Sequence, residues 1–240
     1  MVKEAVNTEA LENEITSSID QAITYAEQLN SEEKSATILD CTNITVRPIF
    51  GFPKTITVNF GDGCGGTNGF VRSGSMSVTI GDTLRTTGTS YDVAFDNFAI
   101  DGYSITGTIS VENTSSGDII SFSEKMDLTM TSDGGIAITK IKTTERAWIE
   151  GTETSDVSDD VFSVSGSADF YSSSGRSYSY SILEPLIITR TCDIFTEGVI
   201  KITMTGSEDP ITVDFGNNGC NWKIYVSQGN IVNEEINLND

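Results

Sequence analysis

The stretch TITVNFGDGC at residues 55–64 decides the fold class, because it returns near the other end of the chain as ITVDFGNNGC at residues 211–220. In each copy polar and apolar residues alternate, as in a β-strand with one buried face, and a glycine turn follows before a cysteine. Each copy also has a cysteine upstream, Cys41 before the first and Cys192 before the second. We therefore expect a related hairpin near both ends of a β-rich domain.

The period-two alternation continues from Asn43 to Leu238, and turn sequences interrupt it about every ten residues. Because the connections are short, consecutive strands should pair as antiparallel meanders, in a sandwich or an open half-barrel. Strands are expected near 43–49, 54–60, 70–80, 90–96, 98–111, 119–130, 135–149, 161–171, 177–190, 195–205, 211–216, 221–227 and 231–238. Turns are expected between them, for example DNF at 96–98.

Residues 8–29 have apolar side chains at every third or fourth position, which predicts one N-terminal amphipathic helix. Thr8 is the expected N-terminal residue of this helix, because acidic residues follow it closely. The polar face carries acids and no lysine, which disfavours anionic membranes and favours packing on the β domain. These acids are Glu12, Glu14, Asp20 and Glu27. The expected division is 1–37, helix and linker packed on the domain, and 38–240, an antiparallel β domain.

The four cysteines predict disulfides rather than a metal site. The chain has no histidine and no CxxC spacing, so a zinc site is disfavoured and no metal is expected. A hairpin of strands 43–49 and 55–60 would bring Cys41 and Cys64 within disulfide reach, and the same argument pairs Cys192 with Cys220. Four buried free thiols are the alternative. Disulfides imply an oxidising compartment and hence export.

The charge of the chain limits its partners. Among 240 residues, 35 are acidic and 14 are basic, which gives a formal net charge of −21. Such a surface repels nucleic acid and anionic lipid, so no nucleic-acid partner is expected. No apolar run approaches the roughly 18 residues that span a bilayer. We recognise no cofactor motif, so no cofactor is expected either.

The sequence contains no arrangement of residues that specifies a reaction. Without histidine, a Ser-His-Asp or Cys-His site is impossible. Two carboxylates could still hydrolyse a glycoside, and the pairs Asp92 with Asp96 and Glu145 with Glu150 are candidates. With so many acidic residues such pairs arise easily, so solvated surface charge is the preferred interpretation. We therefore predict no catalytic residues and no enzyme.

The sequence offers candidates for two other kinds of site, a calcium site and an aromatic platform for glycans. The loops at 61–69, with Asp62 and Asn68, and at 96–102, with Asp96 and Asp101, offer oxygen ligands for calcium, although ordinary turns are the preferred interpretation. Aromatic side chains could form a platform for glycans, although at strand positions they more often belong to the core. These are Trp148, Trp222, Tyr171, Tyr178 and Tyr180.

The order of several motifs resembles a family of uncharacterised exported β-rich lipoproteins of Bacteroidetes. The motifs are TITVNFGDGCGGTNGFVRSG (55–74), YDVAFDNFAIDGYSITGTISVENTS (91–115), ERAWIEG (145–151), SDDVFSVSGSA (158–168), EPLIITRTC (184–192) and VDFGNNGCN (213–221). The resemblance covers nearly all of the β region and implies a protein of the cell envelope or the extracellular surface. It implies membrane attachment only through a lipid-modified N-terminal cysteine that this sequence does not include, and it supplies no activity or catalytic residue.

The resemblance also implies one modification. Asp82-Thr83-Leu84 looks like the acceptor that Bacteroidetes use for O-glycosylation of exported proteins, so Thr83 is a candidate acceptor, with a simple turn as the alternative. The predicted function is a non-enzymatic secreted or cell-surface protein that binds an extracellular partner, such as a glycan, or serves as an envelope component. The alternatives are a carboxylate-dependent glycan hydrolase and an apolar-ligand carrier with the helix as its lid. A large apolar void under the helix would favour the carrier.

Overall fold

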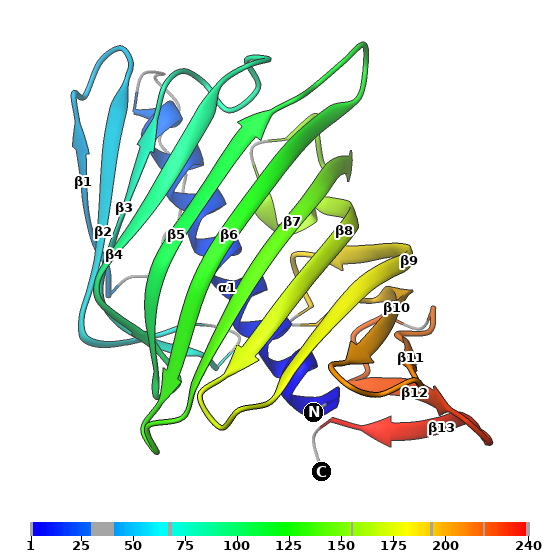
Figure 1. Ribbon diagram of the computed structural model, residues 1–240. Helices are drawn as coiled ribbons and strands as arrows, with labels where there is room; N and C mark the ends of the chain where they lie inside the picture. The colour runs from blue at the N-terminus through cyan, green and yellow to red at the C-terminus, as the bar shows by residue number, and fades with distance from the viewer. Residues whose placement is uncertain are drawn as a thin grey trace.

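The computed structural model consists of one long helix and one antiparallel sheet of thirteen strands (Figure 1). It describes residues 2–29, 41–66, 69–154, 156–192, 194–217 and 219–238. Helix α1 spans Val2–Gln28, and a short 3-10 helix, η1, spans Val157–Asp159. The strands are β1 (Asn43–Arg47), β2 (Lys54–Gly65), β3 (Val71–Ile80), β4 (Ser90–Ile100), β5 (Tyr103–Asn113), β6 (Ile120–Ser132), β7 (Ala137–Glu150), β8 (Val161–Ser172), β9 (Ser177–Thr189), β10 (Glu197–Met204), β11 (Ile211–Asp214), β12 (Lys223–Gln228) and β13 (Ile231–Asn237).

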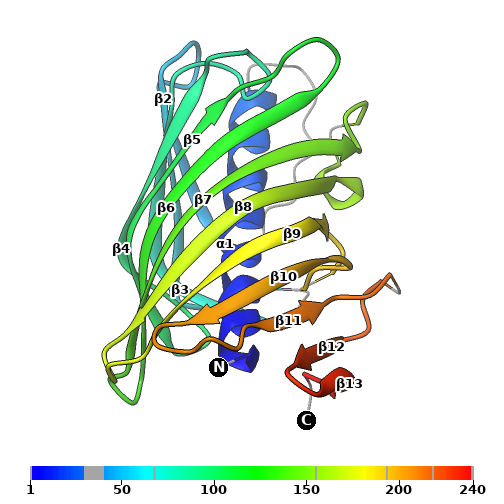
Figure 2. The same ribbon diagram turned by 45° about the vertical axis from the view of Figure 1, so that its right-hand side comes forward.

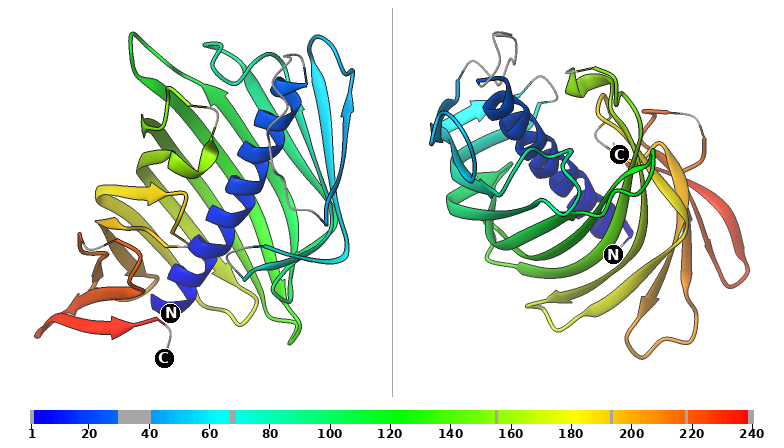
Figure 3. Two further views of the ribbon diagram at one scale, coloured as in Figure 1. Left: turned by 180° about the vertical axis from the view of Figure 1, so that it is seen from behind. Right: turned by 90° about the horizontal axis from the view of Figure 1, so that it is seen from above.

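The sheet is an open meander, as the short connections predicted. Every strand pairs with its neighbours in sequence, and the order runs from β1 to β13 without a crossover. Of the two predicted arrangements, the structure therefore matches the open half-barrel. The strands curve around α1, which lies in the concave face (Figure 2), and the view from above shows that the arc does not close (Figure 3).

Two predicted turns do not form where they were expected. The glycine turn expected before Cys64 is part of β2, which continues to Gly65 with register shifts against β3. The segment 96–98 belongs to β4, and the chain reverses at Asp101 and Gly102. Asn97 has a positive φ of 49°, and the pairing of β4 with β5 shifts register between Ala94 and Ala99. The turn-like sequence therefore forms a bulge, which bends the strand without ending it.

Helix α1 begins earlier than predicted. Thr8 was expected at the N-terminus, but it lies in the second turn, where its hydroxyl donates to the carbonyl of Ala5 at 2.7 Å. The helix extends back to Val2 because Ala5 and Val6 are buried against the later strands and stabilise the first turn. The predicted linker at 30–37 lies outside the described residues.

The hydrophobic core has two parts, one at each end of α1. Leu11, Ile15, Ile19 and Ile23 pack with the inward side chains of β1 to β6, and the N-terminal turns of α1 pack with β8 to β12. Between the two parts, the inward face of β7 carries charged side chains. Most of the length of α1 is therefore enclosed, and its polar side chains face the middle of the sheet.

Candidate functional site: a polar cavity beside the central helix

The first polar face of α1 is buried against the middle of the sheet. Glu9 and Glu12 are both about 2% exposed, and both contact the ammonium groups of Lys140 and Lys142 on β7. The hydroxyl of Tyr180 donates to Glu9 Oε1 at 2.9 Å. Burial alone would raise the pKa of Glu9, but the two lysines outweigh it and hold that pKa at about 2. This cluster is a neutral salt-bridge network inside the fold.

A second ion cluster lies further along the helix. Asp20 accepts from Arg146 Nη1 at 2.9 Å and also pairs with Arg190, while Arg146 Nε lies 2.6 Å from Glu124 Oε1. Burial opposes ionisation of Asp20, yet the two guanidinium groups lower its pKa below the ordinary value. Together with the first cluster, these pairs fill the space between α1 and β7 with charged groups.

Sequence reasoning missed this network. The acids of the helix were assigned to a polar face, but Glu12, Glu14 and Asp20 are at most 8% exposed. The signal lay in β7, where Lys140, Lys142 and Arg146 occupy alternate positions and so share one face. A helix with acids and no lysine on that face is the complementary partner for such a strand.

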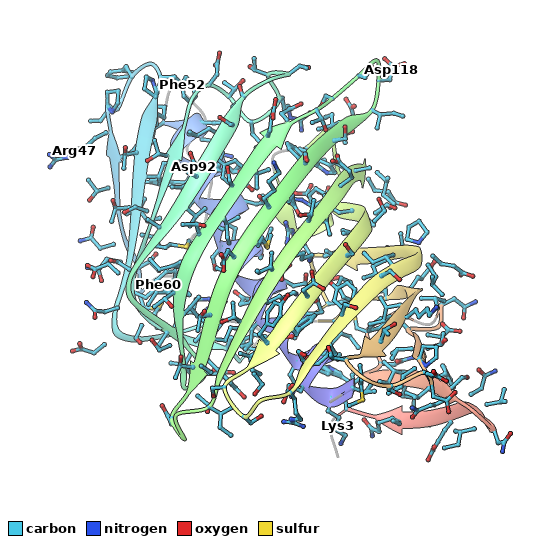
Figure 4. The ribbon with its side chains drawn as sticks, in the orientation of Figure 1. Lys3, Arg47, Phe52, Phe60, Asp92 and Asp118 are labelled. Carbon is cyan, nitrogen blue, oxygen red and sulfur yellow. A yellow bond between two sulfur atoms is a disulfide. The ribbon has the colours of Figure 1, made fainter. Side chains whose placement is uncertain are left out.

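A cavity of about 420 Å³ lies along α1. Its helical side is formed by Ala10, Asn13, Glu14, Ser17, Ser18 and Gln21. Strands β2 and β3 contribute Val58, Phe60 and Arg72, with Gly66 just after β2, and the other side consists of Val157, Ser158, Ile188, Arg190, Thr191 and Cys192. Phe60 lies in the lower half of the sheet (Figure 4). The lining combines hydroxyl, amide and guanidinium groups with a few apolar side chains, which is the composition of a site for a small polar ligand.

The two arginines of the cavity are held by acids of the helix. Arg72 pairs with Glu14, and its Nη1 donates to the carbonyl of Phe70 at 3.4 Å. Arg190 pairs with Asp20, and the side chains of both arginines are about 4% exposed. These contacts fix the arginines in place without using all of their N–H groups.

Both disulfides lie at the margins of the cavity. Cys41 is bonded to Cys64, which is two residues from the lining residue Gly66. Cys192 is bonded to Cys220 and lines the cavity itself. The connectivity is the one that hairpin geometry favours, and no free cysteine occurs among the described residues. The two disulfides indicate an oxidising, extracytoplasmic environment.

A smaller cavity of about 230 Å³ lies near the C-terminal end of α1. Its lining includes Glu27, Asp156, Asp160, Trp148 and Arg85, whose guanidinium carbon lies 4.6 Å from the centroid of the Trp148 ring. Burial and the nearby charge of Asp20 raise the pKa of Asp160 to about 7. Glu27, Asp156 and Asp160 line one cavity together, so among the described acids they come closest to the paired carboxylates that a glycan hydrolase needs.

Two of those carboxylates already have structural partners. Glu27 Oε1 accepts from the backbone N–H of Leu84 at 2.6 Å, and Asp156 Oδ1 accepts from the backbone N–H of Ser158 at 2.9 Å, which caps η1. Both acids therefore hold loops in place, so the cavity offers less support for acid-base chemistry than its composition indicates.

The carboxylate pairs singled out in the sequence are not brought to either cavity. Asp92 and Asp96 are exposed on β4, with Asp92 labelled in Figure 4, and Glu145 and Glu150 are exposed on β7. None of these four acids lines either of the two cavities, so both pairs fit the solvated surface charge that was the preferred interpretation.

The calcium candidates have ordinary structural roles where they are described. Asp101 Oδ1 accepts from the backbone N–H of Val71 at 2.8 Å, and Asp62 is exposed on β2. Asn68 lies outside the described residues. Within the described ranges, no group of three acidic or cysteine side chains is placed to hold a metal ion.

The aromatic side chains do not form one platform. Tyr178 and Tyr180 point into the core, where Phe170 stacks on Tyr178 with ring centroids 4.5 Å apart, while Tyr171 is half-exposed. Trp148 packs on Phe162 and lines the smaller cavity. Trp222 is partly buried against the second part of the core.

Thr83 lies in the loop between β3 and β4, where its side chain is partly buried. Its hydroxyl is 2.8 Å from that of Thr86, and its backbone N–H is held by Asp82. The segment is thus a hydrogen-bonded turn, and O-glycosylation of Thr83 stays a prediction.

Helix α1 is too polar to cross a membrane, and no other helix in the described part of the chain is long enough. Comparison with protein-family models, with curated proteins and with solved structures found no match.

Proposed function

We propose that this protein is a non-enzymatic binding protein that holds a small ligand in the larger cavity beside α1. The observation that carries the proposal is the cavity itself, which has a volume of about 420 Å³ and walls from α1, β2, β3 and the end of β9. Pockets for small ligands measure about 300–1,000 Å³ and combine apolar walls with a few fixed polar groups. The ion pairs of Arg72 and Arg190 supply such fixed groups.

Catalysis has less support than binding. The chain has no histidine, and the one carboxylate of the cavity, Glu14, is paired with Arg72. A glycan hydrolase needs two carboxylates across the substrate, one protonated and one ionised. In the smaller cavity Glu27 and Asp156 are bound to backbone N–H groups. We therefore propose no catalytic residue.

An apolar-ligand carrier also has less support. It requires a large apolar void under the helix, whereas in the described residues the space between α1 and β7 contains Glu9, Glu12, Lys140 and Lys142. The larger cavity is lined by serine, asparagine and arginine side chains as well as apolar ones. A ligand with polar groups fits this lining better than a purely apolar one.

The proposed place of action is the cell envelope or the extracellular surface, with an extracellular small molecule or glycan fragment as the partner. The two disulfides support it, as does the resemblance to exported lipoproteins of Bacteroidetes. Among the described residues, the buried bases Lys54, Arg72, Lys140, Lys142, Arg146 and Arg190 are matched in number by the buried acids Glu9, Glu12, Glu14, Asp20, Glu124 and Asp160. The chain has a formal net charge of −21, so the excess of acids among the described residues lies on the outer surface. An acidic surface favours a soluble protein that avoids nucleic acid and anionic lipid.

A fragment screen by amide-detected NMR tests this proposal. We expect several soluble compounds to shift resonances that cluster on the lining residues, among them Ser17, Ser18 and Thr191. Ser17→Trp should abolish those shifts, because the indole would fill the cavity. The proposal is wrong if no compound binds, or if the shifts cluster away from the cavity and persist in Ser17→Trp.

A further inference from the structure

The larger cavity contains hydrogen-bond donors that have no acceptor in the described part of the protein. Among its described lining residues, three buried side-chain atoms lack a hydrogen-bond partner: Asn13 Nδ2, Arg72 Nε and Arg190 Nε. All three are donors. A buried donor without an acceptor is unfavourable, so a ligand that supplies acceptor oxygens would satisfy all three.

The three donors come from separate elements around the cavity. Asn13 belongs to α1 and is 7% exposed, Arg72 belongs to β3 and is 3% exposed, and Arg190 follows β9 with a side chain that is 4% exposed. Their positions are fixed by burial and, for the arginines, by ion pairs with the helix. Such a site can select a ligand by the geometry of its oxygens.

The cations of the lining are arginines whose charges are already paired. Among the described lining residues, Arg72 pairs with Glu14, and Arg190 pairs with Asp20 of α1. The preference for an oxyanion therefore rests on the unpartnered N–H donors and not on a net positive charge. Arginine suits carboxylate and phosphate in particular, because its planar N–H groups match two oxygens at once.

The apolar side chains of the lining indicate that the rest of the ligand is apolar. Val58, Phe60 and Ile188 lie on the two walls, and Ala10 lies on the helix. Burying a short hydrocarbon chain against them contributes about 25 cal/mol for each Å² removed from water. The ligand should therefore combine oxygen acceptors with an apolar tail.

We propose that the larger cavity binds a small amphiphilic oxyanion, a carboxylate or phosphate ester with a short apolar tail, through Asn13, Arg72 and Arg190. This inference rests on the proposed binding function and specifies its ligand class. The oxygens accept from the three donors, and the tail lies against Val58 and Phe60.

Isothermal titration calorimetry of the intact, disulfide-bonded chain tests it with three matched probes: hexanoate, hexyl phosphate and 1-hexanol. We expect at least one anion to bind about tenfold or more tightly than hexanol, because only the anions supply charged acceptors. The tighter of the two anions identifies carboxylate or phosphate as the preferred group.

Asn13→Asp replaces the amide donor by an acceptor of the same shape, and we expect it to weaken binding of the anion by about tenfold or more while hexanol changes little. Asn13→Leu removes the donor without adding charge and should also weaken the anion, which covers the case in which Asn13→Asp does not fold. Asn59→Asp is the matched control, because Asn59 is exposed on β2 outside the cavity and its Oδ1 already accepts from Gly61.

The outcomes separate the two proposals. If hexanol binds as tightly as both anions, or if both Asn13 variants bind the anion like the wild type, the oxyanion inference is wrong and the binding function stands. If none of the probes binds and the fragment screen also fails, both are wrong. An equal loss in Asn59→Asp would show that general surface charge controls binding, and would overturn the inference.

Discussion

At the scale of single residues, the fold depends on buried ions that neutralise one another. Glu9 and Glu12 on α1 contact Lys140 and Lys142 on β7 with almost no exposure to water. A buried charge is tolerated only when it is paired, so the cost of removing one partner is much larger than the net contribution of the pair. These four residues therefore specify how α1 sits on the sheet more than they add to stability.

The first prediction concerns Lys140. Lys140→Met leaves two buried carboxylates with a single lysine, and we expect it to lower the free energy of unfolding by about 3–5 kcal/mol. The quadruple variant Glu9→Leu, Glu12→Leu, Lys140→Met, Lys142→Met removes every charge of the cluster and should recover most of that loss. Urea denaturation measures both, and a quadruple variant no more stable than Lys140→Met would contradict the account.

The second prediction is a loss of stability in acid. The pKa of Glu9 is about 2 in the folded protein and near its ordinary value of 4.5 in the unfolded chain, because unfolding separates it from the lysines. The unfolded state therefore binds the proton first, and stability is lost as the pH falls from about 4.5 toward 2. Thermal melts across this range should show a steeper decline for the wild type than for the quadruple variant.

The third prediction is a loss of stability as the pH rises. Asp160 is 3% exposed, and burial together with the charges of Asp20 and Asp159 raises its pKa to about 7 despite the proximity of Arg190 and Trp148. The folded state binds the proton more tightly, so stability is lost as the pH rises from about 4 to 7. Asp160→Asn cannot ionise, and we expect its stability to exceed that of the wild type at pH 8.

Melting temperatures of both proteins at pH 5 and pH 8 provide the comparison. We expect the melting temperatures of the wild type and Asp160→Asn to differ only at pH 8. A difference of equal size at both values would show that titration of Asp160 does not control stability.

At the scale of elements, glycines allow neighbouring strands to approach one another closely. Gly107 on β5 has a φ of 122°, and a Cβ there would lie 2.0 Å from the carbonyl oxygen of Asp127 on β6. Gly166 on β8 has a φ of 134° and would collide with Thr143 on β7 in the same way. Only glycine permits both the conformation and the close approach, so both positions exclude a side chain.

The fourth prediction compares two glycines. Gly107→Ala should destabilise the protein by about 2 kcal/mol or more, because the methyl group meets the backbone of β6 in a conformation that alanine avoids. Gly134→Ala in the turn after β6 should change stability by less than about 1 kcal/mol, because its Cβ would lie 3.8 Å from Ser132 Oγ. Equal effects in denaturant unfolding would argue against a special role for Gly107.

The positions of the strands could be predicted better than which face of the helix is buried. Alternation predicted a strand at each of the thirteen places, because period two reports burial on one side of a strand. Some ends were missed: β2 continues to Gly65 instead of ending at residue 60, and β5 begins at Tyr103 instead of residue 98. The turn expected at 96–98 failed because Asn97 forms a bulge, which a local pattern cannot distinguish from a reversal. The acids of α1 were misjudged because their partners on β7 lie more than 100 residues away in sequence.

At the scale of the whole molecule, an open sheet encloses its own N-terminal helix and leaves a cavity beside it. The arc of strands does not close (Figure 3), and Cys192 of one disulfide lines the cavity. The cavity could not be predicted from the sequence, because Asn13, Arg72 and Arg190 meet only when α1 lies inside the arc. The mainly β class and the disulfide connectivity could be predicted, since both follow from local hairpins.

The fifth prediction concerns the disulfide that lines the cavity. Cys192 and Cys220 close a loop with a sequence separation of 28, and replacing both by alanine should cost about 3 kcal/mol through the entropy of the unfolded chain. Affinity for the oxyanion should fall as well, because Cys192 lines the cavity. Unfolding and calorimetry on the double variant measure the two effects, and unchanged stability would contradict the structural role.

A crystal structure of the disulfide-bonded protein grown with hexanoate would show whether the cavity beside α1 is a ligand site. We expect electron density for the carboxylate within hydrogen-bond distance of Asn13 and Arg72, with the tail against Val58 and α1 still paired to Lys140 and Lys142. A ligand bound between α1 and β7, or an empty cavity at saturating hexanoate when calorimetry shows binding, would contradict this expectation.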